Sequence, residues 1–202
     1  MSDIEIFNIT ALDGLIILAA YLVGGISSGY ILVRVRRGID VRSTGSRSTG
    51  ATNVGRILGR PGFYLTLIGD LSKAGLVVWL VRWLNYPPGI VGAVAVAVIS
   101  GHIWSAWLGF HGGKGIASSL GAYLALDYTI LLIGGVALLV AYLITRNFLT
   151  SWILTLVTIP LLAFLLNFSI ALVLPLAVTA VIVLYAHRDN IKEELSQKRY
   201  RG

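Results

Sequence analysis

Cysteine is absent from this chain of 202 residues, and histidine is rare, with three copies. The first absence excludes disulfide bonds, thiol nucleophiles and cysteine-ligated metals, and three histidines are too few for a histidine-rich metal centre. Asp, Glu, Lys and Arg make up only 12% of the residues, whereas a soluble protein carries about 25%. Hydrophobic residues make up 56%, and the mean hydropathy is +0.84. We therefore predict that the bilayer is the solvent for most of the chain.

Several apolar segments, separated by charged or turn-forming residues, are candidates to cross a membrane, where a helix needs about 20 apolar residues. They are residues 14–33, 61–84, 89–110, 116–126, 128–145, 149–166 and 169–186. The fourth is short. We predict that Pro160 breaks the sixth segment and that Pro175 kinks the last. The pattern predicts an all-α, polytopic membrane helical bundle, with residues 1–202 forming a single integral-membrane domain.

The distribution of basic residues predicts how the chain is oriented across the membrane. Residues 34–60 hold seven arginines and one acid, whereas residues 1–13 hold three acids and no base. Basic loops tend to stay in the cytoplasm, which places the N-terminus outside and the basic tail from His187 onward inside. An even number of crossings is needed between Lys114 and His187, because both lie on the predicted cytoplasmic side. Seven transmembrane helices result if residues 116–126 cross, and five if they are re-entrant and one further segment also stops short of crossing; we predict seven. The net charge of +7 favours contact with anionic membrane lipid over nucleic acid.

Two segments on the predicted cytoplasmic side have the composition of phosphate-binding loops. Residues 43–56 combine hydroxyls, glycines and arginines, so backbone N–H groups and guanidinium forks can approach an anion. Residues 109–119 place glycines around Lys114 before a predicted helix start, which also suits an anion. The full P-loop spacing is missing, so nucleotide hydrolysis is not supported. The alternatives are a basic loop touching lipid headgroups and a tight turn anchored by Lys114.

Outside these two loops, several polar or ionisable residues could have either a functional or a structural role. His187 and Asn190 share a face if the last helix continues, and histidine is a candidate general base; the alternative is an ordinary helix end with capping side chains. Asp70, Lys73 and His102 lie within apolar segments, where ionisable groups are candidates for function. Their alternatives are mutual pairing of Asp70 with Lys73 and a hydrogen-bonded histidine inside the bundle.

The two loops and the His187 motif fall on one predicted membrane face. Together they provide phosphate donors, a candidate base and access from the bilayer, which favours an enzyme that joins a water-soluble phosphate compound to an acyl chain. A transporter or flippase for a phosphate-bearing solute is the alternative. Transporters usually contain two related halves with interrupted segments, and this sequence shows no such halves.

These residues resemble the bacterial acyl-phosphate-dependent glycerol-3-phosphate acyltransferases over nearly the whole chain. The likeness rests on an Asp70-x-x-Lys73 pair and on three motifs: Ser46-x-x-x-Gly50-Ala51-Thr52-Asn53-x-x-Arg56, Gly101-His102 with Phe110-x-Gly112-Gly113-Lys114-Gly115, and His187-Arg188-x-Asn190-Ile191. It implies transfer of a fatty acyl group from acyl phosphate to the 1-hydroxyl of sn-glycerol 3-phosphate. The products would be lysophosphatidate and phosphate, the first step of phospholipid synthesis. The resemblance also implies a multi-pass cell-membrane protein with its active site on the cytoplasmic face, and no metal, coenzyme A or other cofactor.

The resemblance implies roles for particular residues. Those expected to be catalytic are Ser46, Arg56, His187 and Asn190. Those expected to bind substrate are Gly50, Thr52, Asn53, Asp70, Lys73, His102, Gly112, Gly113, Lys114 and Gly115. The chain departs from the family pattern at Arg47-Ser48, where Gly-Asn is usual, and at Ser105, where proline is common. A paralogue that has lost activity is therefore a third alternative.

Overall fold

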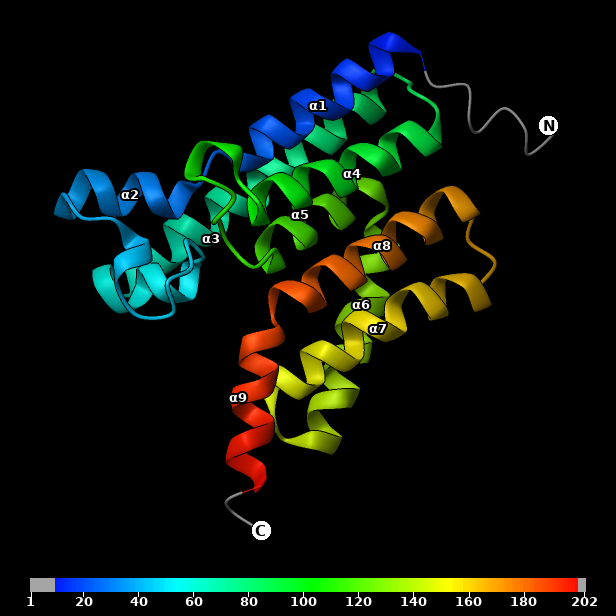
Figure 1. Cartoon of the computed structure of the whole chain (residues 1–202). Helices are drawn as coiled ribbons and strands as arrows, with labels where there is room; N and C mark the ends of the chain where they lie inside the picture. Colours follow the sequence, from blue (N-terminus) through cyan, green and yellow to red (C-terminus); the bar gives the residue numbers. More distant parts are fainter. Residues whose placement is uncertain (1–9, 200–202) are drawn as a thin grey trace.

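The structure, a computed structural model, describes residues 10–199, and this range contains helices and no strand (Figure 1). The α-helices, in chain order, are α1 (Ala11–Gly25), α2 (Ser28–Arg37), α3 (Ala51–Trp83), α4 (Pro88–Ile103), α5 (Ile116–Leu126), α6 (Tyr128–Thr145), α7 (Phe148–Leu165), α8 (Ile170–Ala186) and α9 (Arg188–Arg199). Two single-turn 3-10 helices, η2 (Val41–Ser43) and η3 (Ala106–Leu108), lie in the long connections. The predicted all-α class is confirmed.

The predicted membrane segments correspond to helices, and the short one coincides with α5. In the described part of the chain, four stretches are long and apolar enough to cross a bilayer: Ala11–Arg37, Ala51–Trp83, Pro88–Leu108 and Tyr128–Thr145. Helices α5, α7 and α8 are apolar but shorter. The predicted break at Pro160 is wrong, because α7 continues through it. A proline removes one backbone N–H, and packed membrane helices tolerate that loss.

A break at Ile26 and Ser27 divides the first apolar segment, which the sequence predicts as one helix, into α1 and α2. Side chains from other parts of the chain bind the carbonyls that the end of α1 leaves free. Trp107 Nε1 donates to Leu22 O at 2.8 Å, Ser105 Oγ to Gly25 O at 2.7 Å, and Lys73 Nζ to Ile26 O at 2.6 Å. Because an unpaired backbone carbonyl is costly inside a membrane, these three donors stabilise the break.

Helix α3 changes direction at Gly59, whose φ of 73° and ψ of −168° lie in a region that only glycine adopts readily. Residues 51–58 form a short arm before this kink, and the rest of α3 runs through the bundle. The predicted loop over residues 34–60 is therefore too long. Helix α2 continues to Arg37 and α3 begins at Ala51, which leaves residues 38–50 as the connection.

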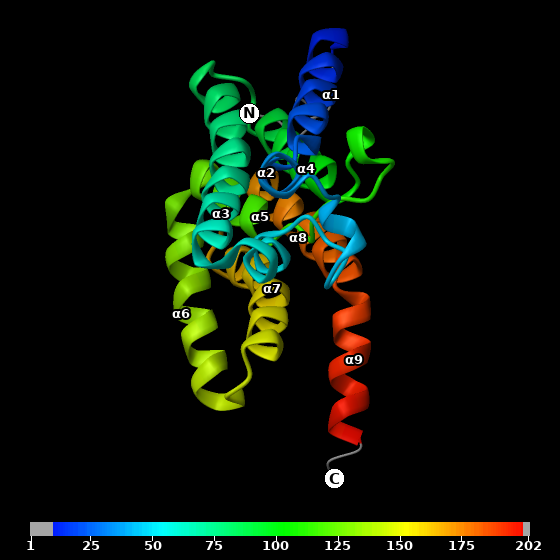
Figure 2. The ribbon, with the colours of Figure 1, turned by 90° about the vertical axis from the view of Figure 1, so that its left-hand side faces the viewer.

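Small residues bring the central helices into backbone contact. A Cβ added to Gly101 of α4 would lie 1.9 Å from the carbonyl oxygen of Tyr21 in α1, and one added to Gly121 of α5 would lie 2.0 Å from that of Leu71 in α3. Close backbone approach of this kind holds membrane helices together. Helix α8 packs on α4 and α7, α6 pairs with α7, and α9 projects from the end of α8 (Figure 2).

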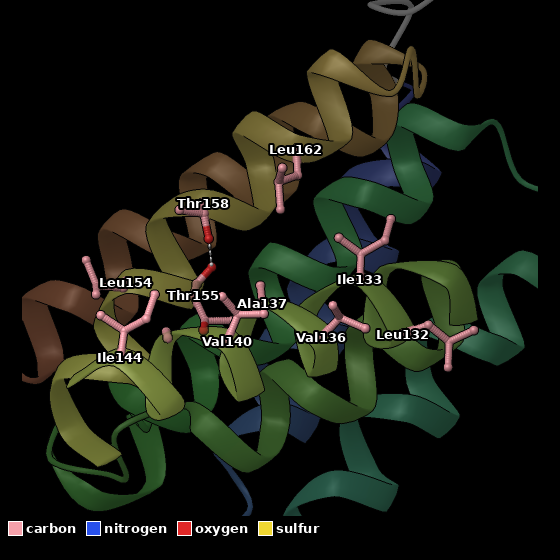
Figure 3. A pocket seen from close by; sticks show the side chains of 11 residues that line it. Leu132, Ile133, Val136, Ala137, Val140, Ile144, Leu154, Thr155, Thr158 and Leu162 are labelled. Atoms are coloured by element: carbon pink, nitrogen blue, oxygen red, sulfur yellow. Dashed lines mark hydrogen bonds between the residues drawn. The ribbon is translucent and has the colours of Figure 1, made fainter. Parts of the chain in front are cut away.

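An apolar groove of about 670 Å³ separates parts of α6 and α7 (Figure 3). Its lining is aliphatic apart from Thr155 and Thr158, and Thr158 Oγ1 donates to the carbonyl of Thr155 at 3.2 Å. None of its lining residues belongs to the predicted site. In a bilayer, hydrocarbon chains of lipid can cover such a surface, so the groove does not define the chemistry of the protein.

Candidate active site

The connection between α2 and α3 is folded around the side chain of Asn53, which is 1% exposed. Its Nδ2, which carries two protons, lies within hydrogen-bonding distance of three carbonyls, so one proton is shared between two of them: Val41 O at 3.0 Å, Thr44 O at 3.1 Å and Ser48 O at 2.9 Å. Its Oδ1 accepts from the N–H of Ser46 at 3.0 Å. The amide of Asn53, a predicted substrate ligand, is thus used to shape the loop.

This folded loop leaves several predicted phosphate donors free. Ser46, Thr52 and Arg56 are exposed, and their side chains make no hydrogen bond with any other residue within residues 10–199. Helix α3 begins after Gly50 without a side-chain cap, so its first N–H groups are also available. Free hydroxyls, a guanidinium fork and an uncapped helix N-terminus are the donors that an oxyanion requires.

The glycine-rich segment closes onto the end of α4. The N–H of Gly112 donates to Ile103 O at 3.0 Å, and that of Gly113 donates to His102 O at 2.9 Å, which pairs two carbonyls that the helix end leaves free. A Cβ on Gly112 would lie 2.1 Å from His102 O, and one on Gly113 would lie 2.0 Å from His102 Nε2. Side chains are therefore excluded at both positions. Gly115, with φ of 92°, turns the segment into α5, which also lacks a side-chain cap.

Hydrogen bonds join these two loops into one structure. The N–H of Thr49 donates to Gly112 O at 3.3 Å, and Arg42 Nη1 donates to Leu108 O at 2.6 Å. Arg42 Nη2 also pairs with Asp40 Oδ2 at 2.7 Å, and its hydrogen bonds lower the pKa of Asp40. Sequence reasoning missed Arg42 and Thr49. The Asp40-x-Arg42 spacing was the one available signal, and it does not reveal a partner 66 residues away.

Lys114 connects the glycine-rich segment to the last motif, because its Nζ donates to Asn190 Oδ1. Burial lowers the pKa of Lys114 below its ordinary value. The carboxylates of Asp189 and Glu193 oppose that shift, and the charges of Arg56 and Arg188 reinforce it. Residues from all three sequence motifs therefore act on one another electrostatically at this end of the bundle.

His187 follows α8 and is 4% exposed. Its Nδ1 lies 2.8 Å from the carbonyl oxygen of Val183. Since a carbonyl can only accept, we assign the proton to Nδ1, which leaves Nε2 of the neutral ring as an acceptor. Burial lowers the pKa of His187, the hydrogen bond to Val183 raises it, and the charge of Lys114 lowers it. A neutral ring with a free Nε2 is the form that a general base needs.

Asp70, Lys73 and His102 form a separate, buried cluster. Lys73 Nζ lies 3.0 Å from Asp70 Oδ1, 3.1 Å from His102 Nδ1 and 2.6 Å from Ile26 O. An ammonium group has three protons and no acceptor, so all three protons are used and His102 Nδ1 accepts one of them. Asp70 Oδ1 also accepts from the N–H of Ser28 at 3.4 Å. These three predicted substrate ligands are partners of one another.

The structure thus separates the predicted site residues into three groups. Those gathered at the loop end of the bundle are Ser46, Gly50, Thr52, Arg56, Gly112, Gly113, Lys114, Gly115, His187 and Asn190. Asn53 supports the first loop, and Asp70, Lys73 and His102 lie in the buried cluster. Among residues 10–199, no group of three or more His, Asp or Glu side chains could hold a metal ion.

Comparisons with known proteins identify relatives of nearly the whole chain. A sequence profile described as glycerol-3-phosphate acyltransferase matches residues 14–197. Glycerol-3-phosphate acyltransferase 1 of Desulfitobacterium hafniense is 40% identical over 190 residues, covering 94% of each chain. The glycerol-3-phosphate acyltransferase of Geobacter sulfurreducens is 38% identical over 183 residues, covering 90% of this chain and 93% of its own.

A solved structure has the same fold. The integral membrane glycerol 3-phosphate acyltransferase PlsY, in its glycerol 3-phosphate form, superposes with a TM-score of 0.83 at 26% identity, covering 93% of this chain and 94% of its own. The fold is therefore that of an integral membrane acyltransferase. The chain belongs to the glycerol-3-phosphate acyltransferase family.

Proposed function

We propose that this protein transfers a fatty acyl group from acyl phosphate to the 1-hydroxyl of sn-glycerol 3-phosphate, forming lysophosphatidate and phosphate. The family is that of enzymes named for acyl transfer to glycerol 3-phosphate. The related PlsY has also been solved in a lysophosphatidic acid form, at a TM-score of 0.81 and 25% identity.

The observation that carries the proposal is the contact between Lys114 and Asn190 beside His187. It brings a phosphate-binding cation and a candidate base from distant segments to one place, 76 residues apart in sequence. A glycerol 3-phosphate held by Lys114, Arg56 and the loop N–H groups would present its hydroxyl near Nε2 of His187.

The reaction is direct attack. The substrate hydroxyl forms a bond to the acyl carbonyl carbon while the bond from that carbon to the phosphate oxygen breaks. The hydroxyl proton passes to Nε2 of His187 or to the departing phosphate. Phosphate is a good leaving group, so positioning and charge stabilisation supply most of the catalysis. Ser46, Thr52, Arg56 and Lys114 hold the two phosphates, and the acyl chain enters from the bilayer between helices.

The proposal includes a membrane arrangement of seven spans, formed by α1 with α2, α3, α4, α5, α6, α7 and α8. With basic loops in the cytoplasm, the N-terminus lies outside and the site lies on the cytoplasmic face. Arg34, Arg36, Arg37 and Arg146 support this, since they lie at helix ends or connections on the side of the site. Residues 1–202 then form one domain whose phosphate site faces the cytoplasmic pool of glycerol 3-phosphate.

A coupled product assay tests the proposal. Purified protein in lipid receives palmitoyl phosphate and glycerol 3-phosphate, and phosphate and lysophosphatidate are measured together. We expect equal release of both, and loss of both in His187→Ala and Lys114→Ala. Phosphate without lysophosphatidate would mean hydrolysis or another acceptor. Neither product from folded protein would contradict catalysis and favour transport or a paralogue without activity. A serine trapped as an acyl ester by mass spectrometry would contradict direct attack.

A further inference from the structure

His102 connects the buried cluster of Asp70, Lys73 and His102 to the glycine-rich segment. The carbonyl of His102 accepts the N–H of Gly113 at 2.9 Å. Its ring fills the space beside Gly113, where a Cβ would lie 2.0 Å from Nε2 and 2.6 Å from Cε1. The residue after Gly113 is Lys114, so the ring of His102 lies directly beside the backbone that carries Lys114.

The plane of the ring is in turn fixed by Lys73. Nδ1 of His102 lies 3.1 Å from Lys73 Nζ, which is held at 3.0 Å by Asp70 Oδ1 and at 2.6 Å by Ile26 O. His102 is 2% exposed and Asp70 is 1% exposed, so neither can turn toward water. Burying the Asp70–Lys73 ion pair costs free energy. In return, the pair holds the ring of His102 in one orientation.

We propose that His102, oriented by Lys73 and Asp70, is a positioning residue that sets Lys114 for binding of glycerol 3-phosphate. The inference rests on the proposed function and deepens it. It gives the cluster a role without direct contact to substrate. It also explains why the ammonium of Lys73 has all its protons engaged within the bundle while that of Lys114 contacts Asn190 at the loop end.

Reciprocal suppression tests the proposal. Gly113 is not among the glycines with positive φ, so alanine fits its backbone and clashes with the ring of His102. Gly113→Ala should raise KM for glycerol 3-phosphate by about tenfold, the factor expected from one lost hydrogen bond to a charged group. His102→Asn removes Nε2 and Cε1 and keeps an acceptor for Lys73 at the position of Nδ1. The Gly113→Ala/His102→Asn pair should therefore recover most of the lost affinity.

Two matched variants exclude a general loosening of the fold. Gly112→Ala would meet the backbone oxygen of His102 at 2.1 Å, which His102→Asn leaves in place, so no recovery is expected in that pair. Tyr123→Phe breaks the buried hydrogen bond between Tyr123 and Thr179, in α5 and α8. It should lower the melting temperature and leave KM for glycerol 3-phosphate unchanged.

A second substitution keeps the proposal testable if His102→Asn does not fold. Asp70→Asn/Lys73→Met removes both charges together and frees the ring. It should raise KM for glycerol 3-phosphate about tenfold and leave KM for palmitoyl phosphate unchanged.

Three results would overturn the proposal: no recovery in Gly113→Ala/His102→Asn, equal recovery of Gly112→Ala, or an unchanged KM in Asp70→Asn/Lys73→Met. These comparisons can be made only if the unmodified enzyme forms lysophosphatidate. If it makes none, the proposed function fails instead.

Discussion

Two clusters of polar residues in this protein contain the same kinds of side chain and differ in how many partners they have. In the buried cluster, Lys73, Asp70 and His102 satisfy one another and the carbonyl of Ile26. At the loop end, Lys114 contacts Asn190, and within residues 10–199 neither Nε2 of His187 nor the side chain of Arg56 makes a hydrogen bond. A lysine next to a histidine therefore does not by itself identify a reaction site, because its ammonium protons can all be engaged in hydrogen bonds within the protein. In this protein, side chains with unused hydrogen-bonding atoms lie at the proposed reaction site, whereas those of the buried cluster are engaged with one another and stabilise the surrounding structure.

Removing the base should give the largest effect on the open cluster. His187→Ala deletes the acceptor Nε2, and loss of a general base typically lowers kcat between about 10²-fold and 10⁴-fold. The melting temperature should change little by comparison. Steady-state kinetics and thermal melting on the same preparation check this. A kcat within threefold of the unmodified enzyme would mean that the leaving phosphate takes the proton.

Removing one charge should give the largest effect on the buried cluster, and here stability changes. Asp70→Asn leaves the ammonium of Lys73 without a counter-charge, and breaking a buried ion pair in this way costs about 3–5 kcal/mol. The double variant Asp70→Asn/Lys73→Met should be clearly more stable than Asp70→Asn. Thermal melting in detergent compares the two. Equal melting temperatures would show that the pair is not charge-coupled.

The pH dependence should report on the open cluster. Burial lowers the pKa of His187 below 6.5 and that of Lys114 below 10.5. Activity needs His187 neutral and Lys114 charged, so kcat/KM should fall as pH drops below 6.5 through the pKa of His187. It should also fall at alkaline pH as Lys114 loses its proton. Lys114→Arg should move the alkaline limit upward, because a guanidinium stays charged.

The smallest effect is expected at Arg47, where the family usually has glycine. Its φ of 54° is a left-handed conformation that costs a non-glycine residue about 1–2 kcal/mol. Asparagine tolerates this conformation better, so Arg47→Asn should raise stability by up to about 1 kcal/mol, measured by thermal melting. We expect kcat and KM to stay within twofold. A large gain in activity would instead identify a paralogue whose activity Arg47 had reduced.

Much of the helix pattern could be predicted from the sequence, because apolar length determines it. The segment at residues 116–126 was predicted at the bounds of α5. The sequence prediction missed the break at Ile26, because no proline or charge interrupts the apolar segment, although Gly24 and Gly25 precede the break and Ser27 caps α2. It depends on donors from Lys73, Ser105 and Trp107, which become neighbours only when the bundle folds. The opposite error occurred at Pro160, where the sequence predicts a break and α7 continues.

The site could be predicted as a set of residues, though their separate roles could not. Gly112, Lys114 and His187 were expected on one membrane face, and in the structure they lie at one end of the bundle. Thr52 and Asn53 are adjacent in sequence, yet only Thr52 is exposed. The side-chain amide of Asn53 points into the loop and contacts four backbone groups there. Which of two adjacent polar side chains faces inward depends on how the loop closes.

The most direct test of the distinction between the two clusters is glycerol 3-phosphate binding, measured by titration calorimetry on purified protein in detergent. Lys114→Ala should abolish measurable binding. Asp70→Asn/Lys73→Met should keep it, weakened about tenfold, because the buried cluster only positions the loop. If the double variant lost binding as completely as Lys114→Ala while remaining folded, Lys73 would be a direct ligand and the distinction would be wrong.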